Sequence, residues 1–496
     1  MSEGGEEAQR DPGLELLAVG LGLGLFGDLA LRITPWGAGA ALTAALVLGA
    51  VLVLQRRHGT PVAVRIAEGG GVGLAVAGLL WRDATVLKAL DAVVVIVALA
   101  LLASERAGQR APRTLAAYAA RVVGSGFHSL FGAPVVLVAD VSWRTMNTPW
   151  RTLVGALRGL LLAVPVVIVF GSLLASADAV FSARLAALID VDLLAVCDHL
   201  LGIAACAWLA AGLLRAAVRR ADPAHRPFVS VDGPLLGGVE AAIVLGLVDL
   251  LFGAFVWVQL RYLFGGSEWV QQAAGLGYAE YARRGFFELV AVTALVLPLL
   301  LVLDWAVRPQ GRGRKIFASL AGLQVALVLV MLASALERMR LYRAEYGLTE
   351  LRVYTTAFMV WLGALLLLFA GTVLRGRREA FARAALASAV AAVVGLHVFD
   401  PERRIVETNR ATARAFDAGY AAGLSADAAP ALVDTVGQLA EADKRRVAQA
   451  LLARWSSTAP DDWRAWSLSR RRARKAVIAA EPALRVAAGD GQASAR

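Results

Sequence analysis

The sequence predicts an all-α fold, a polytopic transmembrane helix bundle with a small C-terminal helical domain outside the membrane. Of its 496 residues, 58% are hydrophobic, and the mean hydropathy is +0.63, whereas soluble domains are about 45–50% apolar. The apolar residues also gather into runs of about 18–22 residues, the length at which a helix crosses a hydrocarbon core of about 30 Å. We therefore expect an integral membrane protein embedded in a lipid bilayer.

The apolar runs predict about eleven spans within residues 14–399. The third is interrupted by the glycine-rich stretch EGGGVG. A further apolar segment, 127–140, is only 14 residues long and has Arg on both sides, so we expect it to be interfacial or re-entrant rather than crossing. The predicted spans cover residues 14–32, 36–54, 66–81, 85–103, 158–176, 193–214, 239–260, 286–305, 316–336, 349–373 and 381–399.

The distribution of basic residues predicts the orientation of the chain. The loops that follow even-numbered spans carry 21 Lys and Arg residues, against 11 in the loops that follow odd-numbered spans. The even-numbered loops should therefore be cytoplasmic. The acidic N-terminal tail, residues 1–13, is then cytoplasmic, and with eleven spans the region 400–496 is extracytoplasmic. Because much of the basic charge flanks spans, the net charge of +11 does not indicate nucleic-acid binding.

The region after residue 399 is more polar and predicts soluble helices. One helix is expected within 424–455 and another after residues 459–463. The second carries the basic run RRRARK, residues 470–475. This run can contact anionic lipid headgroups or form a solvated helix face.

Ionisable residues within the predicted spans gather near their extracytoplasmic ends. Charges at membrane depth are costly and normally face the bundle interior, a partner or water. Lys88 and Asp91 stand three residues apart on one span, which lets them pair. Asp249 lies in the middle of its span with no obvious partner on the same helix, so it is either a functional carboxyl or a protonated, hydrogen-bonded one.

A ladder of alternating charge leads into the eighth span. Glu280, Arg284 and Glu288 are spaced four apart, which places them on one helix face and lets them neutralise one another. Arg352 lies about one turn inside the tenth span. We expect it to pair with a carboxylate on another helix, Glu288 first and Asp249 second.

These residues define a candidate binding surface that faces outward. Two interpretations remain open, because the charges can staple helices together at the membrane surface or line a polar cavity that binds a ligand or relays protons. The candidate binding residues are Asp249, Arg284, Glu288, Glu337 and Arg352.

Sequence motifs of known chemistry are absent. No Lys is followed by Ser or Thr, so there is no P-loop, and neither H-E-x-x-H nor G-x-S-x-G occurs. The sequence therefore predicts no catalytic residue, metal ligand or cofactor site. Gly20 and Gly24, and likewise Gly69 and Gly73, have the spacing that favours close packing of membrane helices.

Several stretches resemble a bacterial membrane protein family known as domain of unknown function 4173. The resemblance rests on YAEYARRGFFELV (278–290), YRAEYGLTELRVYTTAFMVW (342–361) and NRATARAFDAGYAAGLSADAAPAL (409–432), and also on FGSLLASADAVFSARL (170–185) and DDWRAWSLSRRRA (461–473). It implies a polytopic protein of the bacterial inner membrane and no particular activity.

Three functions fit this sequence. The first is a structural or signalling membrane protein whose outer charged surface docks an envelope protein or senses an envelope component. The second is a transporter or proton-coupled carrier that uses Asp249 and the outer charges. The third is an enzyme acting on a lipid-linked substrate with a carboxylate such as Glu288 as base. The first needs no catalytic motif and is the function we expect.

Overall fold

The computed structural model describes residues 12–57, 66–104, 114–141, 193–218, 238–264, 286–307, 311–411, 416–456 and 462–489. Every regular element in these ranges is a helix, which confirms the all-α fold class. The predicted span 158–176 and the ladder residues Glu280 and Arg284 lie outside the described ranges.

Within these ranges nine helices are long and apolar enough to cross a membrane, so the chain is a multi-pass membrane protein. In hydrocarbon a helix satisfies its own backbone hydrogen bonds, which is why apolar runs of this length fold as they do. The nine are α1 (Pro12–Leu31), α2 (Ala38–Arg57), α4 (Thr85–Ser104), α8 (Leu193–Val218), α9 (Gly238–Phe264), α12 (Phe286–Val307), α13 (Gly311–Tyr346), α14 (Glu350–Thr372) and α15 (Arg378–Phe399).

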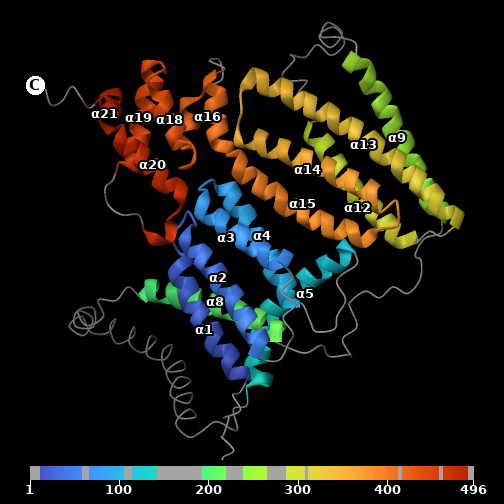
Figure 1. Ribbon diagram of the computed structural model, residues 1–496, viewed down its shortest axis with the longest axis horizontal. Coiled ribbons are helices and arrows are strands. Elements are labelled where there is room, and N and C mark those ends of the chain that lie inside the picture. Colours follow the sequence, from blue (N-terminus) through green and yellow to red (C-terminus); the bar gives the residue numbers. More distant parts are fainter. Residues whose placement is uncertain are drawn as a thin grey trace, which may run out of the picture.

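The predicted third span is the shorter helix α3 (Ile66–Trp81). At 1.5 Å per residue its 16 residues are about 24 Å long. Helices α1 to α4 and α8 form one group, and α9 and α12 to α15 form a second (Figure 1). The two groups meet where α15 packs against α3 and α4.

Close packing of α1 on α8 confirms the role expected for Gly20 and Gly24. A Cβ atom on Gly24 would lie 2.6 Å from the Cβ of Ala207, and one on Gly20 would lie 3.0 Å from that of Ala211. The absence of side chains therefore lets the two backbones approach. The second glycine pair does not act in this way, because a Cβ on Gly73 would meet nothing within 4 Å.

The segment predicted to be interfacial or re-entrant lies at the C-terminal end of α5 (Leu115–Val135) and in the π-helix η1 (Val136–Asp140). Near the start of α5, Tyr118 packs with Leu101 and Ala382. At the other end, Asp140 forms an ion pair with Arg215 near the end of α8. These contacts place both ends of α5 at the ends of α4, α8 and α15 that point away from the C-terminal helices, and α5 runs across the bundle there (Figure 1).

The C-terminal region forms a helical unit with its own apolar core. Its helices are α16 (Pro401–Ala411), α17 (Ala418–Gly423), α18 (Ala429–Val436), α19 (Glu441–Trp455), the 3₁₀ turn η2 (Trp463–Ala465), α20 (Leu468–Ala479) and α21 (Glu481–Ala488). Ile405, Leu432, Val447 and Val477 are buried in this core, and Leu348 from the α13–α14 turn joins them. The unit therefore packs directly on the membrane helices.

Three turns of the membrane bundle contact the C-terminal helices, so they lie on one side of the molecule, called here the junction side. Trp466 accepts a hydrogen bond at 2.9 Å from the backbone N–H of Ala38 at the start of α2. The Asn409 side chain bonds both backbone groups of Leu348, at 2.6 and 2.8 Å. The third is the α3–α4 turn, residues 82–84, described below.

Candidate functional site

Asp249, the central candidate of the sequence analysis, is buried on α9 and only 5% exposed. Neither of its carboxylate oxygens has a hydrogen-bond partner among the described residues, and the same is true of the side chains of Gln259 on α9 and Gln324 on α13. Buried polar groups without partners are uncommon in folded proteins. The structure does not bring Asp249 to Glu288 or Arg352.

Glu288 lies in the first turn of α12 and lines a groove of about 480 Å³ between α9, α12 and α13. Gln259 and Arg338 are the other polar residues of this lining, and the rest is apolar. The neighbouring candidate Glu337 instead forms an exposed ion pair with Arg340 on its own helix, at 2.6 Å. Arg284 lies outside the described residues.

The expected pairing of Arg352 with a carboxylate is wrong for the part of the chain that the structure describes. Its guanidinium donates to the backbone oxygens of Tyr346 and Gly347 at 2.8 and 2.7 Å, and it lies 4.3 Å from the ring centroid of Tyr342. The reason is that α13 ends at these residues. The last carbonyls of a helix lack intrahelical partners and attract a cation, and a tyrosine ring adds a cation–π contact.

The expected pairing of Lys88 with Asp91 is also wrong. Lys88 bonds to Asp83 in the preceding turn at 2.5 Å, and Asp91 bonds to His397 on α15 at 3.1 Å. Both side chains are buried. They find their partners across elements because the α3–α4 turn has only three residues and keeps its own charges inside the protein.

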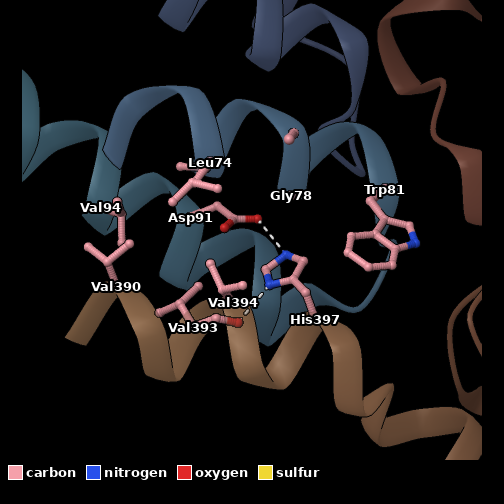
Figure 2. Close-up of a pocket in the computed structure, with 11 residues that line it drawn as sticks. Leu74, Gly78, Trp81, Asp91, Val94, Val390, Val393, Val394 and His397 are labelled. Atoms are coloured by element: carbon pink, nitrogen blue, oxygen red, sulfur yellow. Dashed lines mark hydrogen bonds and ion pairs between the residues drawn. The ribbon is translucent and has the colours of Figure 1, made fainter. Parts of the chain in front are cut away.

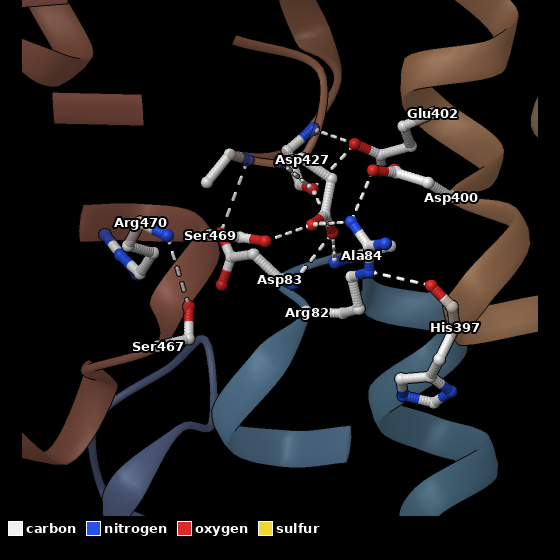
Figure 3. Close-up of polar contacts among 12 residues, drawn as sticks. Arg82, Asp83, Ala84, His397, Asp400, Glu402, Asp427, Ser467, Ser469 and Arg470 are labelled. Atoms are coloured by element: carbon white, nitrogen blue, oxygen red, sulfur yellow. Dashed lines mark hydrogen bonds and ion pairs between the residues drawn. The ribbon is translucent and has the colours of Figure 1, made fainter. Parts of the chain in front are cut away.

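That turn is the centre of the junction, the polar cluster of Arg82, Asp83, Asp400, Glu402 and Asp427, in which Asp400 is half-buried and the other four are buried (Figure 3). Arg82 makes three polar contacts. Its Nε donates to the His397 carbonyl at 2.9 Å, and its Nη1 bonds to Asp400 and lies 3.5 Å from Asp427. One guanidinium thereby joins α3, the end of α15 and the C-terminal helices.

Asp427 caps helix α4 from a distant part of the chain. One of its carboxylate oxygens accepts the backbone N–H groups of Asp83 and Ala84, both at 2.8 Å. The other oxygen accepts the hydroxyl of Ser469 on α20. These two N–H groups stand directly before Thr85, the first residue of α4, where the end of a helix carries partial positive charge, so a buried carboxylate there is both hydrogen-bonded and electrostatically favourable.

The Asp83 side chain in turn contacts the C-terminal unit. One of its oxygens accepts from Lys88, and the other lies 3.5 Å from the backbone nitrogen of Ala426. Every charge in the turn therefore has a partner of opposite sign or a backbone donor, which is the condition for burying charges at an acceptable free energy.

Asp400 and Glu402 stand where α15 passes into α16. Pro401 has no N–H and cannot continue a helix, so α15 ends there, and Asp400 takes the left-handed conformation with φ of 55°, which Asp tolerates better than most residues. This break directs the Asp400 side chain to Arg82. Glu402 accepts the backbone N–H and the hydroxyl of Ser425, at 2.8 and 2.6 Å.

Both carboxyl groups are harder to ionise than usual. Burial raises the pKa of Asp400, although the neighbouring Arg82 opposes this rise. Burial also raises the pKa of Glu402, to about 8, opposed by the Ser425 hydroxyl and reinforced by the negative charge of Asp427. At neutral pH Glu402 is therefore mostly protonated.

Sequence reasoning missed the junction. The signal available was the pair Arg82–Asp83 in a turn of three residues between two apolar helices, which leaves little chain to carry the charges to water. The positions of Asp427 and Ser469 could not be read in this way, because they depend on how the C-terminal helices dock. Among the described residues no group of three or more His, Cys, Asp or Glu side chains is arranged to hold a metal ion.

The sequence model of a protein family described as domain of unknown function, DUF4153, matches residues 69–435. The chain belongs to the DUF4153 family. The number in the resemblance given above, 4173, is therefore wrong, although the description as a family of unknown function holds. Searches of curated proteins and of solved structures found no match.

The DUF4153 match covers both sides of the junction. It includes the α3–α4 turn with Arg82 and Asp83, the α15–α16 break with Asp400 and Glu402, and the Asp427 carboxylate. Only Ser469 of the contacts described here falls beyond it. The cluster thus lies within the matched domain.

We predict that Glu402 makes the stability of this DUF4153 protein fall as pH rises. Its pKa is about 8 in the folded protein against an ordinary value of 4.5, so between these values the unfolded chain loses a proton that the folded chain keeps, and folding becomes less favourable by at most about 5 kcal/mol. The variant Glu402→Gln can still accept from Ser425 and should remove this part of the pH dependence.

The measurement is the thermal unfolding temperature of the purified full chain in detergent between about pH 5 and pH 8.5. Glu407→Gln serves as the matched control, since Glu407 is on the same helix but pairs with Arg403 at the surface. Equal pH slopes for the wild type and Glu402→Gln would contradict the prediction.

Proposed function

We propose that the chain is a structural or signalling membrane protein of the bacterial inner membrane that presents its C-terminal helices as a charged docking surface outside the cytoplasm. The observation that carries this proposal is the junction. Arg82 and Asp427 fix the C-terminal helices to α3, α4 and α15 through buried bonds. A surface held in one orientation on the membrane suits docking or sensing.

The junction also weighs against a carrier that opens on this side. Moving α3 and α4 away from the C-terminal helices would break the bonds of Arg82 and Asp427 and leave buried charges unpaired, at about 3–5 kcal/mol for a buried pair. A carrier remains a second candidate function because Asp249 is buried at membrane depth with neither oxygen partnered among the described residues. In that function Asp249 would bind the coupling proton or the substrate.

The extracytoplasmic orientation of the C-terminal helices is part of the proposal. Its support is the excess of Lys and Arg in the even-numbered loops. The turns after α1, α3 and α13 contact the C-terminal helices, and all three are odd-numbered loops in the predicted topology. The basic loops then lie on the opposite side.

The docking surface that we favour is the basic face of α20. Arg471, Arg472 and Lys475 are exposed, and no ion pair of their side chains with a described residue is present. Helix α20 follows directly on Trp466, which is itself exposed and bonds to the first residue of α2. Since Trp is typical of the membrane–water interface, the first turn of α20 starts at headgroup level.

We therefore favour anionic lipid headgroups as the partner of α20. Long basic side chains that leave the interface there reach the phosphate groups of the same membrane, and each contributes about 1 kcal/mol near an anionic surface. An acidic segment of an envelope protein is the other occupant of this surface, and the experiment below separates the two.

We predict that the triple variant Arg471→Gln, Arg472→Gln, Lys475→Gln retains fewer anionic lipids. The loss of about 1 kcal/mol per residue corresponds to an affinity about 100-fold lower. The measurement is native mass spectrometry of the full chain extracted from membranes that contain phosphatidylglycerol. The control is Lys444→Gln, Arg445→Gln, Arg446→Gln, which removes the same charge from α19.

Equal lipid retention in the two triple variants would contradict lipid docking. If both variants retain lipid like the wild type, and only the α20 variant fails to restore growth of cells that lack the protein, the partner is an envelope protein.

We also predict that alkaline phosphatase fused after Arg496 is active, since this enzyme folds only outside the cytoplasm, and that a cytoplasmic reporter at the same site is silent. The reverse pattern would contradict the extracytoplasmic orientation and with it the docking surface.

A further inference from the structure

Asp91 on α4 and His397 on α15 form a buried acid–base pair between the two helix groups (Figure 2). The Nε2 atom of His397 lies 3.1 Å from Asp91 Oδ2, and its Nδ1 atom lies 2.9 Å from the backbone oxygen of Val393. The aspartate is 1% exposed and the histidine 4%. No function described above uses this pair.

The two hydrogen bonds fix how many protons the pair holds. A carbonyl oxygen cannot donate, so Nδ1 must carry a hydrogen to bond Val393. Neutral imidazole then has a bare lone pair at Nε2, which bonds Asp91 only if the carboxyl is protonated. If Asp91 is ionised, Nε2 must carry a second hydrogen and the ring is cationic. In both arrangements the pair holds one proton beyond ionised aspartate and neutral histidine.

The surrounding backbone is shaped for this pair. A Cβ atom on Gly78 of α3 would lie 2.6 Å from both Asp91 Oδ2 and His397 Nε2. Glycine at this position therefore gives the carboxylate and the ring their space against α3. Any other residue would push the two groups out of place.

A cavity of about 80 Å³ adjoins the pair. Leu74, Val94, Val390 and Val394 line it together with the two polar side chains. Since a water molecule occupies about 30 Å³ of liquid, the cavity has room for water next to polar partners. Such water gives the shared proton a route off the pair.

The groups that face the pair come from each element packed against it, and those that are charged are paired with one another. From α3, Trp81 lies with its ring centroid 6.3 Å from that of His397, and Arg82 bonds the His397 carbonyl. From α4, Lys88 lies one turn before Asp91 and is neutralised by Asp83. After α15, Asp400 is neutralised by Arg82. The fixed charges nearby are thus paired with one another, and the proton on Asp91 and His397 is the one that can leave.

We propose that Asp91 and His397 together form a binding site for one exchangeable proton. On release, the hydrogen between the carboxylate and Nε2 passes to a water molecule in the adjacent cavity, giving ionised Asp91, neutral His397 and hydronium. The lone pair of Nε2 then faces a carboxylate, and the contact between α4 and α15 becomes repulsive. The bound proton therefore stabilises the contact between α4 and α15. Because α15 runs directly into Asp400 and α16, this contact lies on the same side of the bundle as the junction.

Magnetic resonance of the full chain in lipid nanodiscs tests the site, with ¹⁵N in histidine and ¹³C in the aspartate carboxyl groups. His397 is assigned by the signal that His397→Gln removes. At pH 7 we expect either a doubly protonated ring or a protonated Asp91 carboxyl. On raising the pH, the signals of both residues should change together in one step, since coupled groups titrate as a pair. Neutral His397 beside ionised Asp91 at pH 7, or two independent steps, would overturn the proposal.

The variant Asp91→Asn gives the matched comparison. The amide N–H of asparagine can donate to Nε2, so the contact is kept while the shared proton is lost. We expect neutral His397 with its hydrogen on Nδ1 at pH 7 and above. A doubly protonated ring in this variant would show that Asp91 does not hold the proton.

A second variant covers the case in which Asp91→Asn does not insert. Gly78→Ala keeps both Asp91 and His397 but crowds them. In protein present at normal membrane levels, it should abolish the single pH step in which the two signals change together. If the two signals still changed together in one step in Gly78→Ala, the pair would not depend on the space that Gly78 leaves, and the proposed site would be overturned. The pair of exposed His199 and buried Asp28, at 2.7 Å, provides a comparison in the same spectra.

Discussion

The carboxylate of Asp427 is the interaction on which the arrangement of this protein depends. It lies in the C-terminal unit, between α17 and α18, yet it accepts the backbone N–H groups of Asp83 and Ala84, the two residues directly before the membrane helix α4. These donors lie in a turn of three residues that is closed off from water, so without Asp427 they would be buried and unpaired at about 1–3 kcal/mol each. On this side the membrane bundle therefore needs the C-terminal unit to satisfy its buried backbone donors, and the C-terminal unit is held in place by the same bonds.

The buried polar groups around the α3–α4 turn are satisfied by partners from other elements or from the turn itself. Arg82 joins α3 to the end of α15, Asp83 takes the ammonium of Lys88, and Asp91 takes His397. Each bond between elements fixes a relative position, whereas pairs along one helix stabilise only that helix. In the account proposed here, protonation of Glu402 and of the pair Asp91–His397 links the stability of this side of the protein to pH.

The sequence predicts the fold class because the length and apolarity of the runs are local properties. The hydropathy pattern sets the segment 127–140 apart as a separate piece of 14 residues, whereas it is the end of the longer helix α5 continued by η1, and its expected interfacial or re-entrant position stays a prediction. The partners of individual charged side chains were harder to predict from the sequence. Lys88 and Asp91 have the right spacing to bond each other, but helix spacing says nothing about Asp83 or His397, which approach only when α15 docks on α4.

Arg352 illustrates the same limit. A cation inside a span suggests a carboxylate partner, but the carbonyls at the end of α13 and the ring of Tyr342 satisfy it instead. Such backbone acceptors depend on where the preceding helix ends, and hydropathy does not fix helix ends to within a residue. The sequence places Asp249 and Glu288 only along their own helices, and their surroundings follow from the packing of α9, α12 and α13.

The distance between the C-terminal helices and the α3–α4 turn tests this account most directly. After Cys197 and Cys206 are replaced by serine, spin labels at Thr85 and Arg471, both exposed, allow a pulsed electron resonance measurement in nanodiscs. We predict one narrow distance distribution for the otherwise unchanged chain, a wider one for Asp427→Asn, which keeps one acceptor oxygen, and the widest for Asp427→Ala. Distributions that are equally narrow in all three proteins would contradict the claim that Asp427 holds the C-terminal helices to the membrane bundle.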